Sequence, residues 1–455
     1  MTKYSYEMDM CNGPLTKKIL TFSIPLMFSG ILQLLFNAVD MIVVGRYSGS
    51  DALAAVGSTA PLINLLVNVF IGLSVGANVL IAQACGAHNE KQMSETIHTS
   101  VLLSIICGFF LSFIGILSAK PLLILMGTPN EVLELATLYM KIYFIGMPAM
   151  LLFNFGSSIF RAMGDTKRPL YFLLIAGIIN AILSLVFVIV FKMSVAGVGL
   201  ATVIAQCVAA LLITLCLMRN SGGSQLVLSK LHINKSVLFR IMRIGLPAGF
   251  QGAIFSISNV LIQSSVNSFG AIAMAGNAAT ANLEGFVYTS MNAFYQTSLS
   301  FTGQNIGGKK YERIKPILRT CLLSVFIVGS LMSLLFFIFR LPLLGLYSSD
   351  PEVIAYGTAR MKIIFSTYFL CGSMDVLVGS IRGLGYSILP MIISLLGACG
   401  LRVLWVFTAF KFVPTLTMLY ISYPISWGIT FIVNVLCFEL LYKKIYGKQH
   451  LSIAH

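Results

Sequence analysis

The chain has 455 residues, of which 57% are hydrophobic and only 10% are charged, and its mean hydropathy is +0.91. Soluble domains carry roughly 25% charged residues, so this composition excludes an ordinary water-soluble protein and predicts an integral membrane protein. The formal net charge of +15 is then interpreted as a topology signal and as attraction to anionic lipid. Nucleic acid is not expected as a partner.

Apolar runs long enough to cross a hydrocarbon core of roughly 30 Å recur along the sequence. They predict twelve spanning helices, near residues 16–45, 52–83, 96–119, 138–160, 169–191, 195–218, 238–268, 272–303, 317–339, 358–381, 389–410 and 415–442. The runs are continuously apolar and much longer than the roughly 10 residues of a membrane strand, which argues against a β-barrel. We therefore predict an all-α bundle, because spanning helices satisfy their own backbone hydrogen bonds.

The basic residues are distributed unequally between the two ends of these runs. Of the thirty Lys and Arg residues, 21 fall in the N-terminal segment, the loops that follow even-numbered runs and the C-terminal segment, and Arg402 lies inside a run. Eight lie at the opposite ends: Arg46, Lys120, Lys141, Lys192, Arg340, Arg360, Lys362 and Lys411. By the positive-inside rule, we expect a multi-pass protein of the plasma membrane with both termini in the cytoplasm. The first run is too long for a cleaved signal peptide and is expected to remain as a helix.

The first apolar run contains the stretch LFNAVDMIVVG, residues 35–45, with a carboxylate at Asp40 and an amide at Asn37. The two side chains are three residues apart and share one helix face. An ionisable group inside a membrane span costs several kcal/mol, so it is a functional candidate by default. Asp40 lies roughly 8 Å from the end of its run.

Other polar side chains in this half of the chain lie at a similar depth. In the fifth run, Ser184 lies roughly 12 Å from the outer end and Asn180 is one turn before it. In the sixth run, Thr202 lies roughly 10 Å from the outer end. Asn154, in the fourth run, lies closer to the midplane and could reach the same cavity. These residues and Asp40 are therefore expected to form one polar cluster.

A polar loop at 219–237 divides the predicted spans six and six, and the two halves repeat each other. When Gln83 is aligned with Gln304, IAQACGAHNEK pairs with FTGQNIGGKKY. The same offset, 304 − 83 = 221, aligns MKIYF at 140–144 with MKIIF at 361–365. Six spans separate equivalent positions and six is an even number, so the halves have the same orientation. Such a parallel repeat is typical of transporters that move two lobes about a central site.

The repeat predicts two six-helix lobes and three connecting or terminal segments. They are a cytoplasmic N-terminus at 1–15, an N lobe at 16–218, a cytoplasmic linker at 219–237, a C lobe at 238–442 and a cytoplasmic C-terminus at 443–455.

Several dispersed motifs resemble one known family. They are FNAVDMIVVGRYSGSDALAAVG in the first run, QACGAHNEK and GQNIGGKKYERI after the second and eighth, FRAMGDTKRP and IRGLGYSILP after the fourth and tenth, and GLATVIAQ in the sixth. Together they resemble the multidrug and toxic compound extrusion (MATE) family over residues 15–440. The resemblance implies a twelve-helix antiporter that expels cationic or amphipathic compounds as protons or sodium ions flow inward.

The resemblance also implies an ion-coupling site at Asp40, Asn154, Asn180 and Thr202. The chain departs from the family in one respect, because the second acid that many members carry after the fifth-run asparagine is Ser184 here. A single carboxylate holds sodium less strongly, and burial favours the protonated form of a carboxyl group. The proton is therefore the expected coupling ion. Sodium, held by Asp40, Asn180 and Thr202, is the alternative, and no other metal or cofactor is expected.

The second half of the chain carries its own polar positions. Glu284, Tyr288, Asn292 and Gln296 recur at a spacing of four and form a polar stripe on one helix. That stripe could line a substrate cavity or make hydrogen bonds between helices.

Two further embedded charges follow the stripe. Asp375 is the repeat mate of Asn154 and resembles the acid of this lobe in some family members. Arg402 could be the counter-charge of Asp375 or Glu284, as a structural pair or as part of the transport site. The charged residues inside the predicted spans are then three acids, Asp40, Glu284 and Asp375, and one base, Arg402.

Proline residues inside the predicted spans permit kinks, because each removes a backbone hydrogen bond. They are Pro25 in the first run, Pro148 in the fourth and Pro247 in the seventh. The resemblance implies that the helix around Pro25 bends when Asp40 is protonated, whereas a static kink is the simpler interpretation.

The predicted function is a cation-coupled multidrug efflux antiporter that works by alternating access on small cationic or amphipathic molecules, as a monomer. One alternative is a flippase for a lipid-linked saccharide, which would require a more basic cavity. A membrane-embedded transferase is another alternative. The nine cysteines contain no CxxC pair and none of the five histidines lies mid-span, so the sequence offers no catalytic or metal cluster for an enzyme.

Overall fold

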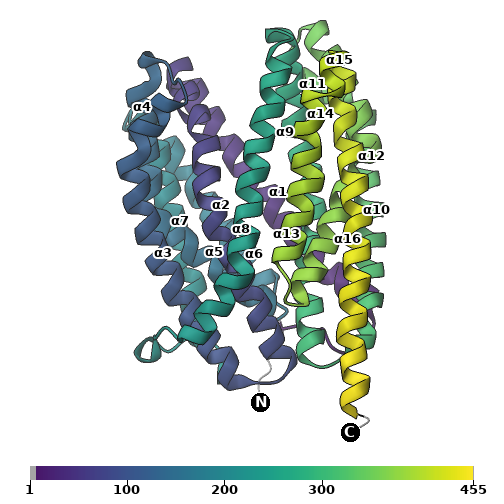
Figure 1. The fold of residues 1–455 in the computed structure, drawn as a ribbon. Helices are drawn as coiled ribbons and strands as arrows, with labels where there is room; N and C mark the ends of the chain where they lie inside the picture. The colour runs from purple at the N-terminus through teal and green to yellow at the C-terminus, as the bar shows by residue number, and fades with distance from the viewer. Residues whose placement is uncertain (1–6, 454–455) are drawn as a thin grey trace. The chain divides into compact units, whose positions relative to one another are not determined.

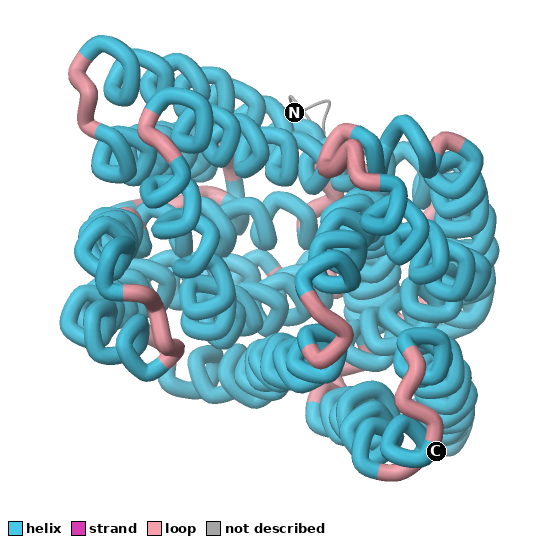
Figure 2. Tube along the Cα trace, turned by 90° about the horizontal axis from the view of Figure 1, so that it is seen from above, coloured by secondary structure: helices cyan, strands magenta, loops and turns pink. Residues whose placement is uncertain are grey.

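The computed structural model describes residues 7–453, and it describes side chains as far as residue 447. The far ends of the predicted terminal segments 1–15 and 443–455 lie outside these residues. Throughout the described range the regular structure is helical and no strand forms (Figures 1 and 2). The prediction of an all-α fold is confirmed.

The helices follow one another with short connections. Their bounds are α1 Leu15–Tyr47, α2 Ser50–Gly86, α3 Glu90–Leu125, α4 Asn130–Ile145, α5 Met147–Ala162, α6 Lys167–Leu185, α7 Ser194–Arg219, α8 Lys235–Asn267, α9 Ala271–Gly307, α10 Ile314–Ile338, α11 Arg340–Gly345, α12 Pro351–Gly383, α13 Ile388–Ser394, α14 Leu401–Phe407, α15 Ala409–Phe412 and α16 Leu416–Ile453. Two π-helical turns, η1 at Val186–Val190 and η5 at Leu395–Gly400, extend α6 and α13, and short 3-10 turns occur at Gly222–Ser224, Leu228–Lys230 and Tyr311–Arg313.

Ten helices of the described chain are long and apolar enough to cross a membrane, and the pair α4 and α5 would make an eleventh span. These two helices meet at a bend of 49°, where Gly146 ends α4 and Pro148 occupies the first turn of α5. Proline is tolerated there because first-turn N–H groups have no helical acceptor. The remaining predicted span corresponds to α9, whose 37 residues are long enough but rich in small polar side chains. The fold is consistent with twelve spans.

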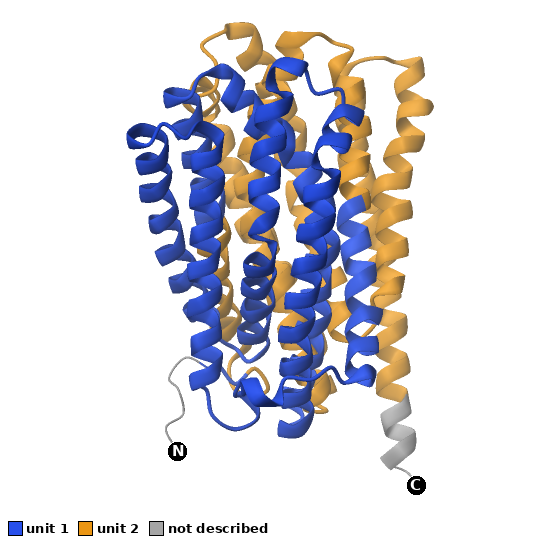
Figure 3. Ribbon diagram, turned by 90° about the vertical axis from the view of Figure 1, so that its left-hand side faces the viewer, with its two compact units in different colours: residues 1–9, 31–253 blue, residues 10–30, 254–455 orange. Residues whose placement is uncertain are grey.

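Packing divides the chain into two compact units (Figure 3). Unit 1 comprises Met1–Asp9 and Ile31–Ala253, and unit 2 comprises Met10–Gly30 and Ile254–His455. The predicted lobes 16–218 and 238–442 differ from these units in two half-helices. The first half of α1 belongs to unit 2, and the first half of α8 belongs to unit 1.

Close packing explains why each half-helix belongs to the unit it does. In unit 2, Phe22 of α1 meets Phe301 of α9 edge to face at 5.5 Å, and the hydroxyls of Ser23 and Thr297 lie 2.7 Å apart. In unit 1, a Cβ atom added to Gly245 of α8 would lie 2.6 Å from the Cα atom of Leu73 in α2. Only small residues allow two helix backbones to approach so closely.

These two contacts occupy equivalent places in the repeat. Thr297 of α9 is the repeat mate of Gly76 in α2, since 297 − 76 = 221. Gly76 packs against the backbone of α8 at Ile241 and Gly245. The α1–α9 and α8–α2 contacts are therefore two copies of one arrangement, in which one copy uses bulky side chains and the other uses glycine.

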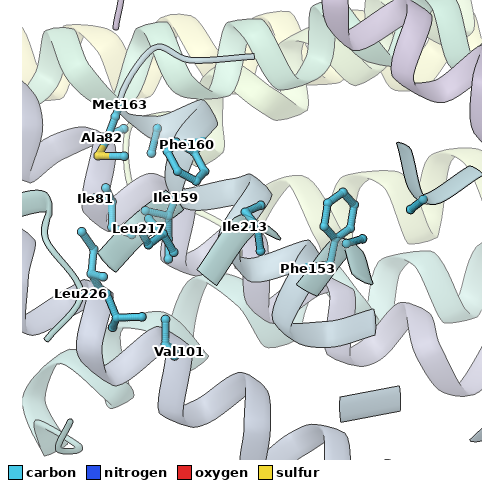
Figure 4. Close-up of a cluster of buried hydrophobic side chains, with 14 of the residues drawn as sticks. Ile81, Ala82, Val101, Phe153, Ile159, Phe160, Met163, Ile213, Leu217 and Leu226 are labelled. Carbon is cyan, nitrogen blue, oxygen red and sulfur yellow. The ribbon is translucent and has the colours of Figure 1, made fainter. Parts of the chain in front are cut away.

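A hydrophobic core in unit 1 fixes α2, α3, α5 and α7 together (Figure 4). Ile81, Phe160 and Ile213 in it are fully buried, and Leu226 from the loop after α7 inserts its side chain among them. The adjacent Val227 N–H donates to Nε2 of the buried His98 at 3.1 Å. The loop at 219–237 is thus packed onto unit 1 by both apolar and polar contacts.

Candidate functional site

The Asp40 carboxylate in unit 1 accepts hydrogen bonds from side chains of two other helices. Asn180 of α6 donates from Nδ2 to both Asp40 oxygens, at 3.0 and 3.1 Å, and Ser184 donates from Oγ at 2.9 Å. The hydroxyl of Thr202, in α7, lies 3.4 Å from Oδ2. The structure thus brings together Asp40, Asn180, Ser184 and Thr202, which the sequence places at one depth.

Local packing holds α1 against α6 at this site. The ring of Phe36, one turn before Asp40, lies against Gly177, one turn before Asn180, and no side chain beyond hydrogen would fit there. One turn later Ser184 is fully buried, and the π-helical turn η1 begins two residues after it. Such turns often occur at functional sites because they reorient neighbouring side chains.

The carboxylate of Asp40 is buried without a basic partner. The residue is 8% exposed, and no Lys, Arg or His of the described residues lies within ion-pair distance of it. The oxygen Oδ1 of Asn180 is also buried and accepts no hydrogen bond. When Asp40 is ionised, the site therefore has a negative charge without a basic partner and one unused acceptor oxygen.

Two other predicted members of this region make no bond to Asp40. Asn154 donates from Nδ2 to the carbonyl of Met150 on its own helix at 2.9 Å. Asn37 is exposed and makes no hydrogen bond among the residues that the structure describes. The spacing of three residues put Asn37 on the Asp40 side of the helix, but the α1–α6 contact is made through Phe36 and Asp40.

Metal binding by several charged ligands has no support in the described part of the chain, which contains no group of three or more His, Cys, Asp or Glu side chains. Any ion at Asp40 would be held mainly by hydroxyl and amide oxygens. Sodium accepts such ligands, because hard cations bind carboxylate, carbonyl and hydroxyl oxygen.

In unit 2, Glu284 pairs with a residue that the sequence analysis assigned to a span end. Arg360 of α12 donates from Nε and Nη2 to the two carboxylate oxygens, at 2.7 and 2.8 Å. It also donates from Nη1 to Asn277 of α9, which accepts a further bond from the Tyr420 hydroxyl at 3.3 Å. Glu284 and Arg360 are 9% and 5% exposed.

This pair corrects the interpretation of Arg402 as the counter-charge of Glu284. It also places a second base among the embedded groups, so that three acids face two bases rather than one. The sequence argument against a saccharide flippase used the larger excess of acid, and it loses strength accordingly. Arg360 lies only two residues inside its predicted span of 358–381, so its position in the sequence predicts a charge at the end of the span and not a buried one.

The rest of the predicted stripe on α9 is less tightly bonded. The Tyr288 hydroxyl of α9 is hydrogen-bonded to the half-buried Asp375 of α12, a contact that the sequence pattern did not predict. Asn292 and Gln296 are half-buried and form no hydrogen bond with the described residues.

Arg402 is buried, at 3% exposed. Its Nε donates to Oγ of Ser426 at 2.9 Å, and its guanidinium carbon lies 4.2 Å from the ring centre of Tyr423 and 5.4 Å from that of Trp427. No carboxylate of the described residues lies within ion-pair distance of it, so pairing with Asp375 is also not observed.

Of the three prolines predicted to permit kinks, Pro148 lies at the bend between α4 and α5, whereas Pro25 and Pro247 lie inside continuous helices. Both α1 and α8 run through Pro25 and Pro247 without a break. The carbonyl of Pro25 accepts a hydrogen bond from Oγ of Ser29 at 2.8 Å.

A protein-family model described as MatE matches residues 25–186 and matches again at residues 247–408. The chain belongs to the MatE family. The two matched segments start 247 − 25 = 222 residues apart. This is one residue more than the offset of 221 that aligns Gln83 with Gln304. The inference of two repeated halves is thus supported by the family model as well as by packing.

Proteins similar over nearly the whole chain include two bacterial relatives. The "Probable multidrug resistance protein YoeA" of Bacillus subtilis is 28% identical over 431 residues, 93% of each chain. The "Probable multidrug resistance protein NorM" of Thermotoga maritima is 25% identical and covers 87% of this chain and 86% of its own length.

Among solved structures, an outward-facing MATE family transporter superposes with a TM-score of 0.89 at 21% identity, covering 96% of this chain and 98% of that one. Members of the MatE family are transporters of small molecules in membranes and are not enzymes. The prediction of a multi-pass membrane transporter is therefore confirmed, and the transferase alternative is excluded.

Proposed function

We propose that this MatE-family transporter exports amphipathic small molecules in exchange for protons by alternating access, and that Asp40 binds the coupling proton. Relatives along nearly the full chain carry names of multidrug resistance proteins, which supports export of varied compounds. The distribution of basic residues supports a plasma-membrane location with cytoplasmic termini.

The observation that carries the proposal is the buried, unpaired carboxylate of Asp40. An ionised group inside a membrane span costs several kcal/mol. Donors from Asn180 and Ser184 offset part of this cost, but no cation of the described residues neutralises the charge. A proton or a cation from solution would neutralise the charge of Asp40, so binding of either one would stabilise this part of unit 1.

Two geometric details favour the proton. The single hydrogen of the Thr202 hydroxyl has a nearer acceptor in the Val198 carbonyl, at 3.0 Å, than in Asp40. The Thr202 oxygen can then accept a proton carried on Oδ2 of Asp40. Asn180, in turn, presents its NH₂ group to the carboxylate, whereas an ion bound beside Asp40 would require its oxygen. Sodium binding would therefore require the amide of Asn180 to turn over.

Dye efflux from proteoliposomes tests the proposal. A pH gradient without sodium should drive export, and a sodium gradient at equal pH should not. Asp40→Asn keeps the shape of the side chain but cannot bind the proton, and it should abolish the driven export. Export by Asp40→Asn at the parent rate would overturn the role of Asp40, and export under the sodium gradient alone would overturn the choice of ion.

A further inference from the structure

Arg402 is a buried charge of unit 2 that the geometry described so far does not use. Its Nε has a partner in Ser426, but Nη2 is buried and has no hydrogen-bond acceptor. Only 3% of the residue is exposed. A guanidinium group with an unsatisfied donor in such a place requires an explanation.

The carboxylates around it do not pair with its guanidinium. The ring of Tyr423 lies 4.2 Å from the guanidinium of Arg402 and 5.7 Å from that of Arg360, so the two bases lie close to the same ring. Both oxygens of the Glu284 carboxylate are bonded to Arg360. Asp375 lies near the same group, beside Cys371, but it forms no ion pair with Arg402. Arg402 is therefore a buried base that no described carboxylate pairs with.

Aromatic rings reduce the cost of this charge but do not remove it. Cation–π contacts stabilise a desolvated guanidinium, but by less than the cost of burying an unpaired ion. The same rings form a surface of a particular kind. Trp427 meets Tyr423 at 5.5 Å and Tyr368 at 5.4 Å, so that Arg402 lies at the edge of a group of three packed aromatic side chains.

We propose that Arg402 recognises the anionic group, a carboxylate or a phosphate, of an aromatic amphipathic substrate. A guanidinium group presents a planar set of donors that matches the oxygens of both anions. Trp427 and Tyr423 are 4% and 9% exposed, so the aromatic part of such a substrate would lie beside these rings, next to Arg402. This inference rests on the proposed export function and names its substrate class: anionic or zwitterionic aromatic compounds in addition to cations.

The chain supplies its own reporter, because it contains two tryptophans, Trp405 and Trp427. The variant Trp405→Phe leaves Trp427 as the sole tryptophan, in contact with Arg402, and excitation at 295 nm avoids the tyrosines. We would titrate this full-length variant in detergent with 4-nitrobenzoate, 4-nitrophenyl phosphate, the neutral 4-nitrobenzamide and the cationic 4-nitrobenzylamine. Saturable quenching should occur with one or both anions at a concentration at least tenfold lower than with the amide or the amine.

Adding Arg402→Gln should weaken binding of the anions about 10- to 100-fold, since it removes a charge-assisted hydrogen bond, and should leave the amide unchanged. Arg402→Lys should recover part of the preference, and Arg319→Gln, at an exposed arginine of α10, should retain the whole of it. The ligands should raise the unfolding temperature of the parent but not that of Arg402→Gln.

Equal binding of anions and amide to the parent, or an unchanged preference in Arg402→Gln, would overturn the proposal. So would quenching by chloride alone, which would indicate a small-ion site. Displacement of the probes by phosphatidylglycerol in the micelles would indicate a lipid headgroup and would also overturn it. The measurement uses no ion gradient, so its failure is distinguishable from failure of proton-driven export.

Discussion

Removal of the Glu284 carboxylate should destabilise unit 2 strongly. The pair with Arg360 is bidentate, at 2.7 and 2.8 Å, and the side chains are 12% and 6% exposed. Glu284→Gln keeps one acceptor oxygen but removes the negative charge, so the guanidinium stays buried without a counter-charge. Breaking a buried ion pair in this way costs about 3–5 kcal/mol, because one charge stays buried without compensation.

A double-mutant cycle separates the pair from its surroundings. Arg360→Met removes the base and leaves a carboxyl group that can take up a proton, so the single change should be less harmful than Glu284→Gln. The double variant removes both charges and should recover most of the lost stability. Unfolding of the full chain in mixed micelles, followed by circular dichroism against denaturant concentration, would measure each free energy.

An exposed ion pair provides the control for this cycle. Lys120 and Glu134 lie 2.5 Å apart, but their side chains are 48% and 75% exposed, so Glu134→Gln should produce no measurable change. If the double variant at Glu284 and Arg360 loses as much stability as the two single variants together, then the pair does not act as a unit and the reasoning is wrong.

Three further changes test other parts of the structure. Gly177→Ala places a methyl group in the ring of Phe36, so it should destabilise the chain by about 1–3 kcal/mol and slow driven dye efflux. His98→Ala leaves the Val227 N–H without its acceptor, which should cost about 1–3 kcal/mol and speed tryptic cleavage of the loop after α7. Burial raises the pKa of the Glu7 carboxyl group above 4.5, so the folded chain binds this proton more tightly than the unfolded chain. The stability of the fold therefore falls as the pH rises above about 4.5. Glu7→Gln cannot ionise and should raise the unfolding temperature slightly at pH 7.5.

Each of these changes has a control and a contrary result. Gly428 has open space at its Cβ position, so Gly428→Ala should be harmless, and equal damage at both glycines would refute the packing argument. His88 is exposed and its side chain makes no hydrogen bond with the described residues, so His88→Ala should not alter cleavage of the loop after α7. A lower unfolding temperature for Glu7→Gln at pH 7.5 would show that attraction to Arg168, 3.7 Å away, outweighs the burial of Glu7.

Much of the fold follows from composition and periodicity alone. Apolar runs of membrane length predict helices because the bilayer offers no partner for free backbone groups, and the structure is helical throughout its described residues. The repeat is visible when the chain is aligned with itself, and the family model matches twice at nearly the same offset. The cluster at Asp40 could also be predicted, since the regular rise of a helix places polar side chains of three helices at one depth.

Depth alone does not determine which side chains meet. Asn154 and Asn37 satisfied the same argument, yet neither bonds to Asp40, because the rotation of each helix is set by packing contacts such as Phe36 on Gly177. Arg360 and Glu284 are far apart in the sequence, and no local pattern distinguishes Arg360 from Arg402 as the partner.

The sequence by itself determined that this chain is a helical, duplicated membrane transporter with a carboxylate buried in its first span. Only the tertiary structure decided that α1 and α8 each contribute their first half to the unit of the other repeat, that Glu284 is neutralised by Arg360, and that Arg402 is left unpaired. The physical reason is that hydropathy and spacing report burial and depth, whereas close helix packing and ion pairing depend on which helix faces come into contact.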